Sequence, residues 1–354
     1  MSALAEAAPV AAPELESGGM RERFQHIHSP GRDCRLTCAR DLLDYFGLRY
    51  SHSVVQGLSS ACLFSYARPE DGLQALLYPE LDFRGFFSAV SGGVLEILEN
   101  LAYLFNGRYL VRQQDPADLT LQELRPYLAE GIPVLVAVCR DVVYDHLGLF
   151  YPPWPSYLGP LKFGGHFMPV VGIDDARGVV QMFETNRLPP LELPFEVLHR
   201  ARTQGDGEAD YRMQSLNRWA VFVPSPAPPP LPALMRTALL KTVHAMTDSA
   251  SARAGASGLP ALERFCRELP HWAERMTRDH YQASLFMLRL NSVELSTGAM
   301  GRKGFGIFLR RAAVALGQPE LEPAAHAYAE AAEAWQDLLD LIDDEVLDPE
   351  STRV

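Results

Sequence analysis

One cysteine stands at a position where a thiol can act as a nucleophile. Cys34 follows a turn-forming loop at 29–33 (SPGRD) and falls in the first turn of a predicted helix. There the free backbone N–H groups and the positive end of the helix dipole lower the pKa of a thiol, and the same N–H groups can receive a developing oxyanion. Cys38, one turn later, lacks this position and is expected to pack in the core. Cys34 is therefore the candidate nucleophile, with a structural cysteine as the alternative.

A thiolate nucleophile requires a base, and His166 is the best placed of the ten histidines. It follows two glycines at the start of an apolar stretch predicted as a strand, where glycine permits another chain segment to come close. It lies 132 residues after Cys34, within the gap of about 130–150 residues found in papain-type thiol enzymes. The alternative is a histidine satisfied within the core. Weaker candidates for the base are His26, His28 and His146.

A third side chain usually orients such a base and fixes its tautomer. The next predicted strand ends in Phe-Glu-Thr-Asn, which places Glu184 and Asn186 at 18 and 20 residues after His166. A hairpin turning at 174–177 would bring this end back beside the histidine. Glu184 is the preferred third member and Asn186 the alternative, while Asp174 and Asp175 are expected to be turn residues.

The elements that must position these residues alternate along the first half of the chain. Helices are predicted over 34–46, over 94–105 and from a capping box at Thr120 to 131. Apolar runs predict strands at 108–112, 132–139, 166–173, 178–184 and 218–223. This order indicates an α+β domain.

A proline-rich stretch separates this first half from a helical second half. Six prolines between 224 and 232 predict a stiff, extended linker. Helical patterns follow near 233–246, 260–275, 279–292, 304–316 and 324–346. The predicted organisation is a disordered tail at 1–21, a catalytic domain at 22–223, the linker at 224–232 and an all-α domain at 233–348.

Composition excludes several classes of protein. The 354 residues are 47% hydrophobic, so the chain is not of the disordered class. The net charge of −12 gives no basic footprint for nucleic acid. No stretch looks like a signal peptide or reaches the length of a membrane span. We therefore expect a cytoplasmic protein with reduced thiols that binds neither nucleic acid nor membrane.

Four segments of the first half resemble a known family in their order along the chain. They are DCRLTCARDLL (33–43), GLSSACLFSY (57–66), FRGFF (83–87) and FGGHFMPVVGIDD (163–175). Together with ELSTGAMGR (294–302) in the second half, they resemble the butirosin-biosynthesis acyltransferase family over about 22–345. The resemblance implies a papain-like or bacteriocin-peptidase-like N-terminal domain followed by a helical C-terminal domain.

The same resemblance implies a reaction. Cys34 matches the family's nucleophile and His166 its histidine, so an acyl or aminoacyl group would pass from a carrier-protein thioester to an amine or hydroxyl acceptor through acyl-Cys34, in specialised-metabolite biosynthesis. The phosphopantetheine would belong to the donor, and the enzyme would need no cofactor or metal of its own. Asp33 replaces the family's histidine before the nucleophile and is interpreted as a helix N-cap, and Glu184 stands where the family has aspartate.

Further residues are candidates for binding substrate. Trp154 and Tyr157 lie in an aromatic, proline-rich stretch at 144–162 that would wall an acyl or acceptor pocket, or would be an ordinary packed loop. Glu294 and Arg302 flank a glycine-containing turn, where Arg302 would bind a carboxylate or the phosphopantetheine phosphate, or form an ion pair between helices. Residues able to attract an acidic carrier protein are Arg21, Arg23, Arg32 and Arg35, or Lys303, Arg310 and Arg311.

Two other functions remain open from the sequence. A cysteine peptidase or amidase of the same fold would use water as the acceptor of the same acyl-enzyme. The departures at Asp33 and in the glycine motif at 57–66 suggest a catalytically inactive binding protein. The large helical domain and the expected absence of export favour acyl transfer over hydrolysis.

Overall fold

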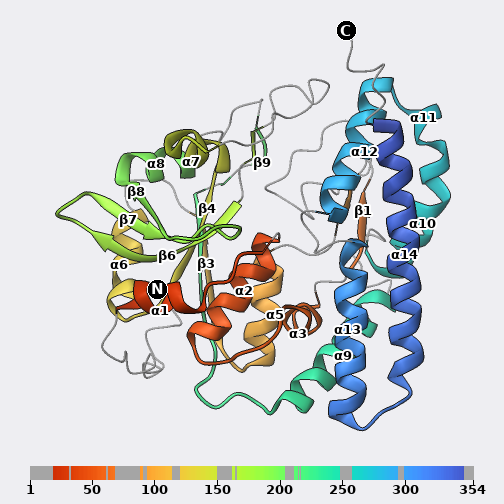
Figure 1. Cartoon of the computed structure of the whole chain (residues 1–354), viewed down its shortest axis with the longest axis horizontal. Helices are drawn as coiled ribbons and strands as arrows, with labels where there is room; N and C mark the ends of the chain where they lie inside the picture. Colours follow the sequence, from red (N-terminus) through yellow and green to blue (C-terminus); the bar gives the residue numbers. More distant parts are fainter. Residues whose placement is uncertain are drawn as a thin grey trace.

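The computed structural model of the chain describes residues 19–31, 33–60, 63–67, 88–90, 94–113, 120–149, 162–163, 166–203, 211–213, 215, 217–247, 257–293 and 299–346. In these ranges every named strand lies before residue 224, and helices follow (Figure 1). The predicted α+β first half and helical second half are thus confirmed. The five predicted strands and the three predicted helices of the first half are confirmed to within a few residues.

The first half is built on one antiparallel sheet of six strands. Their order across the sheet is β3 (Arg108–Gln113), β10 (Arg218–Val223), β4 (Val134–Val138), β6 (His166–Asp174), β7 (Val179–Met182) and β8 (Leu191–Pro194). Two smaller sheets pair β1 (Ser65–Ala67) with β2 (Ser88–Val90), and β5 (Lys162–Phe163) with β9 (Tyr211–Met213). The hairpin that joins β6 to β7 turns where the sequence predicts, and Asp174 accepts a hydrogen bond from the Arg177 N–H at 3.1 Å.

Helices cover both faces of this sheet. In β4, Leu135 and Ala137 face one hydrophobic cluster, and Val134, Val136 and Val138 face the other, because successive side chains of a strand point to opposite sides. The first face is covered by α1 (Met20–Ile27), α2 (Cys34–Tyr45) and α5 (Val94–Leu104). The second is covered by α6 (Thr120–Ala129), α7 (Arg140–Leu147) and α8 (Phe195–Thr203). Burial on both faces explains why β4 is apolar throughout.

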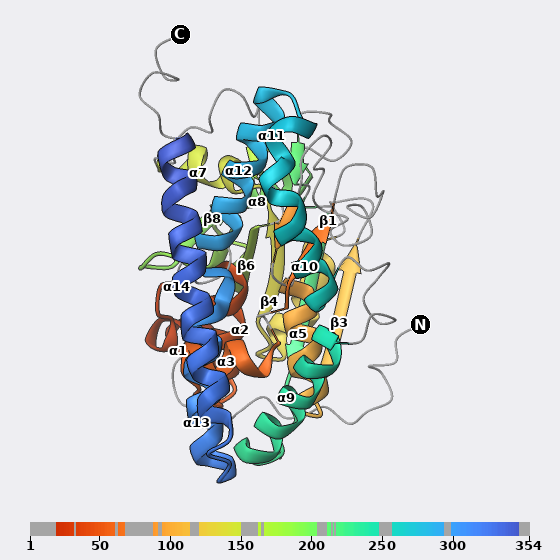
Figure 2. The same cartoon turned by 90° about the vertical axis from the view of Figure 1, so that its right-hand side faces the viewer.

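The helical half lies beside the sheet and is seen in front of it in Figure 2. Its helices are α9 (Leu231–Thr247), α10 (Gly258–Glu268), η5 (Leu269–His271), α11 (Trp272–Arg275), α12 (Arg278–Val293), η6 (Ala299–Gly301), α13 (Arg302–Leu316) and α14 (Leu321–Val346). Two predicted boundaries need correction. Helix α9 begins inside the predicted linker, since Pro232 is tolerated in a first helical turn, and α1 begins at the end of the predicted tail.

The two halves share their hydrophobic cores. Helix α3 (His52–Leu58) packs against α13 so closely that a Cβ on Gly57 would come within 2.0 Å of the Phe308 ring. In the other direction, Tyr66 of β1 packs among Phe265 and Trp272 of the helical half. The linker therefore divides the chain in sequence but does not separate two independent cores.

Candidate active site

Cys34 is the first residue of α2, as the sequence predicts. The carboxylate of Asp33 caps the helix by accepting hydrogen bonds from the N–H groups of Arg35 at 2.9 Å and Leu36 at 3.4 Å. The Arg35 guanidinium also binds this carboxylate, with Nε 3.0 Å from Oδ1 and Nη2 2.9 Å from Oδ2. Asp33 is thus the predicted N-cap, and Arg35 offsets the negative charge that it places beside the thiol.

This cap changes the expected oxyanion site. Asp33 occupies the N–H groups of Arg35 and Leu36, and the Thr37 N–H donates to the Asp33 carbonyl at 2.9 Å. Of the N–H groups in the first turn, these bonds leave that of Cys34 itself. The donor set for an oxyanion at the start of α2 is therefore smaller than the sequence suggests.

His166 lies at the first position of β6, paired with Val138 at the end of β4. Its side chain is buried, and Nε2 lies 2.9 Å from Oε1 and 3.1 Å from Oε2 of Glu184. The side chain of Cys34 is near enough to the imidazole to help raise its pKa. Because the carboxylate engages Nε2, Nδ1 is the nitrogen left to exchange a proton with the thiol.

Glu184 is fully buried and lies two residues after the end of β7. The backbone N–H and the hydroxyl of Thr185 donate to its Oε1 at 2.8 and 3.1 Å. Three hydrogen bonds thus converge on this one oxygen, from Thr185 twice and from His166. A buried carboxylate held in this way keeps a fixed direction toward the imidazole.

The surroundings shift the pKa values of His166 and Glu184 in opposite directions. Burial is the largest influence on His166 and lowers its pKa. The charge of Glu184, the hydrogen bonds with Cys34 and Glu184 and the charge of Cys34 outweigh burial and raise the pKa from 6.5 to about 9. Burial also raises the pKa of Glu184, but His166 and Thr185 lower it from 4.5 to about 2. Near neutral pH the site therefore holds an imidazolium paired with a carboxylate.

Asn186, the alternative third member, points elsewhere. Its residue is exposed, and its Oδ1 accepts a hydrogen bond from the Tyr144 hydroxyl at 3.4 Å. Glu184, and not Asn186, is thus the partner of His166. Tyr144 belongs to α7 and is buried near Glu184, whose charge, after burial, helps raise the pKa of this tyrosine to about 12.

The other candidates lie apart from this geometry. Trp154, Tyr157 and Glu294 are outside the described residues. Arg302 is buried at the start of α13, where Nη1 donates to the Met300 carbonyl at 2.8 Å. Its predicted role in binding a carboxylate or phosphate stays a prediction.

The sequence does not predict the pairing of His28 with Asp41. Its Nδ1 lies 2.6 Å from Oδ2 of Asp41, and both side chains are almost completely buried. A signal was present: Asp41 lies seven residues after Cys34, among the apolar residues of α2, where a charge needs a buried partner.

Comparison with known proteins identifies one family match. Residues 198–350 match the family described as "Domain of unknown function (DUF4872)", a stretch that runs from α8 across the linker and through the helical half. No curated protein matches the chain. Within the described part of the chain, no helix is long and apolar enough to cross a membrane, and no cluster of three or more His, Cys, Asp or Glu side chains could hold a metal ion.

Proposed function

We propose that this protein is a thiol-dependent acyltransferase that moves an acyl or aminoacyl group from a carrier-protein thioester to an amine or hydroxyl acceptor. The observation that carries the proposal is the position of His166, whose imidazole is hydrogen-bonded to Glu184 and whose pKa the nearby Cys34 side chain helps to raise. A thiol, an imidazole and a carboxylate arranged in this order are the groups that covalent acyl transfer uses. The order of motifs along the chain supports a role in specialised-metabolite biosynthesis.

In the first step, the Cys34 sulfur attacks the thioester carbonyl and a new S–C bond forms. The Cys34 N–H at the start of α2 is placed to stabilise the resulting oxyanion. As the intermediate collapses, the bond to the carrier's sulfur breaks, and that sulfur takes a proton from the His166 imidazolium. The products are acyl-Cys34, neutral His166 and the free thiol of the carrier arm.

In the second step, the acceptor attacks acyl-Cys34. Neutral His166 takes a proton from the acceptor's amine or hydroxyl, and the Cys34 sulfur leaves as a thiolate. This returns His166 to the imidazolium form and frees Cys34 for the next donor. Glu184 stays ionised throughout and supports the positive charge on the imidazole.

The donor's phosphopantetheine arm supplies the thioester, so this chain needs to supply only a nucleophile, a base and an oriented carboxylate. An acidic carrier protein would be attracted by exposed basic residues. On α13, exposed basic side chains are Lys303, Arg310 and Arg311. The acceptor would be a small molecule with a nucleophilic amine or hydroxyl group.

The proposal is tested with a small mimic of the donor, the N-acetylcysteamine thioester of acetate. Intact-protein mass spectrometry should show one acetyl group, located on Cys34, in the unaltered chain and in a Cys38→Ala control. Cys34→Ala should abolish this acylation. Treatment of the acylated, unaltered chain with hydroxylamine should release the acetyl group as the hydroxamate. No acylation of Cys34 would refute the proposal, and release as free acid alone, with hydroxylamine present, would assign hydrolysis instead.

A further inference from the structure

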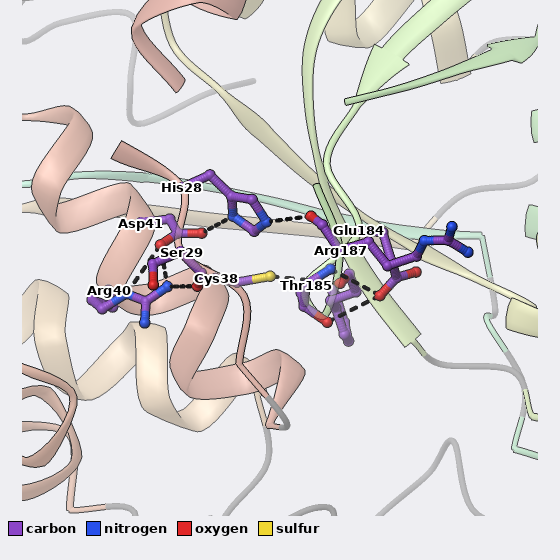
Figure 3. Close-up of polar contacts among 9 residues, drawn as sticks. His28, Ser29, Cys38, Arg40, Asp41, Glu184, Thr185 and Arg187 are labelled. Carbon is purple, nitrogen blue, oxygen red and sulfur yellow. Dashed lines mark hydrogen bonds and ion pairs between the residues drawn. The ribbon is translucent and has the colours of Figure 1, made fainter. Parts of the chain in front are cut away.

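A second buried histidine and carboxylate, His28 and Asp41, take no part in the steps above. His28 lies in the loop before Cys34, and Asp41 lies on α2. Figure 3 draws the pair with its hydrogen-bond partners Arg40 and Arg187. The question is what a buried histidine–carboxylate pair does so close in the chain to a nucleophile.

The ring of His28 bridges two segments that each carry part of the site. Its Nδ1 lies 2.6 Å from Oδ2 of Asp41, and its Nε2 lies 2.9 Å from the carbonyl oxygen of Arg187. A carbonyl only accepts, so Nε2 bears hydrogen and donates to it. One end of the ring is thus tied to the helix of Cys34 and the other end to the segment that follows Glu184.

The same two segments meet at two further points. The Gly31 N–H, three residues before Cys34, donates to the Thr185 carbonyl at 2.8 Å. Thr185 is the residue whose N–H and hydroxyl hold Glu184. The His28 ring also packs against Phe183, with ring centroids 5.2 Å apart, so it contacts the chain on both sides of Glu184.

Asp41 is itself held in place by Arg40. Its Oδ1 accepts from Nε of Arg40 at 3.1 Å and from Nη2 at 2.7 Å, which leaves Oδ2 for His28. The Arg40 guanidinium also donates to the Ser29 carbonyl in the loop before Cys34. The carboxylate therefore has a fixed orientation, as a partner that sets the direction of a ring must have.

We propose that His28, oriented by Asp41, is a positioning residue that holds the segment bearing Glu184 against the helix bearing Cys34. This inference rests on the proposed function, because it concerns the alignment of the thiol with His166. A displacement of about 1 Å between reacting groups can cost a hundredfold in rate. Loosening the contact between the two segments is therefore expected to slow the reaction.

Two amide substitutions separate the two ends of the ring. The amide nitrogen of His28→Gln corresponds to Nε2 and keeps a donor toward Arg187. That of His28→Asn corresponds to Nδ1 and keeps a donor toward Asp41 only. The test measures the second-order rate of alkylation of Cys34 by iodoacetamide in the full chain, assigned to the residue by mass spectrometry, with thermal unfolding as the measure of stability.

The proposal predicts that His28→Asn slows alkylation of Cys34 by about tenfold or more, while His28→Gln slows it by less than about threefold. With the acetyl thioester as substrate, His28→Asn should lower kcat and leave KM unchanged. Equal rates in the unaltered chain and both variants, or equal losses in both variants, would overturn it. Should neither variant fold, Arg40→Ala, on a more exposed side chain, should slow alkylation by about threefold, and an unchanged rate would overturn the proposal.

The alkylation assay needs no acyl donor, which separates this inference from the proposed function. If Cys34 of the unaltered chain reacts no faster than the exposed Cys266, the proposed function and the inference resting on it both fail. If Cys34 reacts faster than Cys266 but its rate of alkylation is unchanged by the two substitutions at His28, the positioning role alone is wrong.

Discussion

The carboxylate of Glu184 illustrates how a single residue can be constrained by its neighbours. Glutamate has one more methylene group than the aspartate that the resemblance implies, and so has more rotamers to lose. The two hydrogen bonds from Thr185 compensate by fixing Oε1 at 2.8 and 3.1 Å from their donors. The position of the charge is thus set by the next residue in the sequence.

Replacement of Glu184 should slow the reaction. Glu184→Gln keeps the shape of the side chain and removes the charge that supports the His166 imidazolium, so turnover should fall by about a hundredfold or more. Steady-state kinetics with the acetyl thioester measure the effect. Asn186→Ala is the matched control two residues later and should stay within about twofold. Equal losses in the two variants would contradict the assignment of Glu184.

The paired charges of His166 and Glu184 also predict how stability depends on pH. The pKa of His166 is raised from 6.5 to about 9, so its contribution is complete below 6.5 and is lost as the pH rises through 9. The pKa of Glu184 is lowered from 4.5 to about 2, so its contribution is complete above 4.5 and is lost as the pH falls through 2. The pair stabilises the fold most between 4.5 and 6.5.

Denaturant unfolding of the unaltered chain and of Glu184→Gln measures this window. The difference in their free energies of unfolding should be largest near pH 6 and should shrink toward pH 9. A difference that is independent of pH between 6.5 and 9 would show that His166 is not held as an imidazolium in the fold.

At the scale of elements, the loop between α1 and α2 positions Cys34. Gly31 lies directly over Thr37, so a Cβ on Gly31 would come within 2.2 Å of the Thr37 hydroxyl oxygen. No hydrogen-bond partner of that hydroxyl lies among the described residues. The glycine thus permits a close approach of loop and helix that any other residue would prevent.

Gly31→Ala should therefore displace the loop and slow alkylation of Cys34 by about tenfold. Thr37→Ala removes the clashing oxygen at small cost, because it breaks no hydrogen bond to a described residue. The double variant should recover most of the rate lost in the single one. A double variant as slow as Gly31→Ala would show that the contact with Thr37 is not the cause.

The elements that the sequence predicts are those whose patterns are local. The β6–β7 hairpin follows from two apolar runs around a polar turn, and it correctly brings Glu184 back to His166. The sequence does not predict helix α7, because its pattern mixes charged and aromatic residues where the aromatic, proline-rich stretch at 144–162 begins. The contact of His28 with Arg187 joins residues far apart in the chain, and no periodicity carries that information.

At the scale of the whole molecule, the helical half completes the core of the half that carries the site. Phe305 and Phe308 of α13 belong to the same hydrophobic cluster as Leu36 and Leu43 of α2. Gln56 of α3 also donates from Nε2 to the Gly301 carbonyl at 2.7 Å. The helix that presents Cys34 is therefore supported from both halves of the chain.

Gly57→Ala tests this shared core. In an exposed helix this change would stabilise by about 1 kcal/mol, but here the new methyl group would meet the Phe308 ring at 2.0 Å. We expect a loss of about 1–3 kcal/mol in the free energy of unfolding, as for an overpacked core. Gly19→Ala, which has open space around it, is the control and should stay within about 0.5 kcal/mol.

The unfolding of this variant should remain a single transition when followed by circular dichroism and by tryptophan fluorescence. Trp219 reports on the sheet, and Trp272 and Trp335 report on the helical half. Two separate transitions, with only one of them shifted by Gly57→Ala, would show that the halves unfold independently and that the core is not shared.

The central claim is that His166 activates Cys34, and the rate of alkylation of Cys34 tests it most directly. Cys34 is only 7% exposed, whereas Cys266 is exposed and serves as an internal reference within the same chain. With iodoacetamide at neutral pH, we predict that Cys34 reacts about tenfold faster than Cys266, and that His166→Gln brings it below Cys266. A Cys34 that reacts more slowly than Cys266 in the unaltered chain, at a rate that His166→Gln leaves unchanged, would contradict the account.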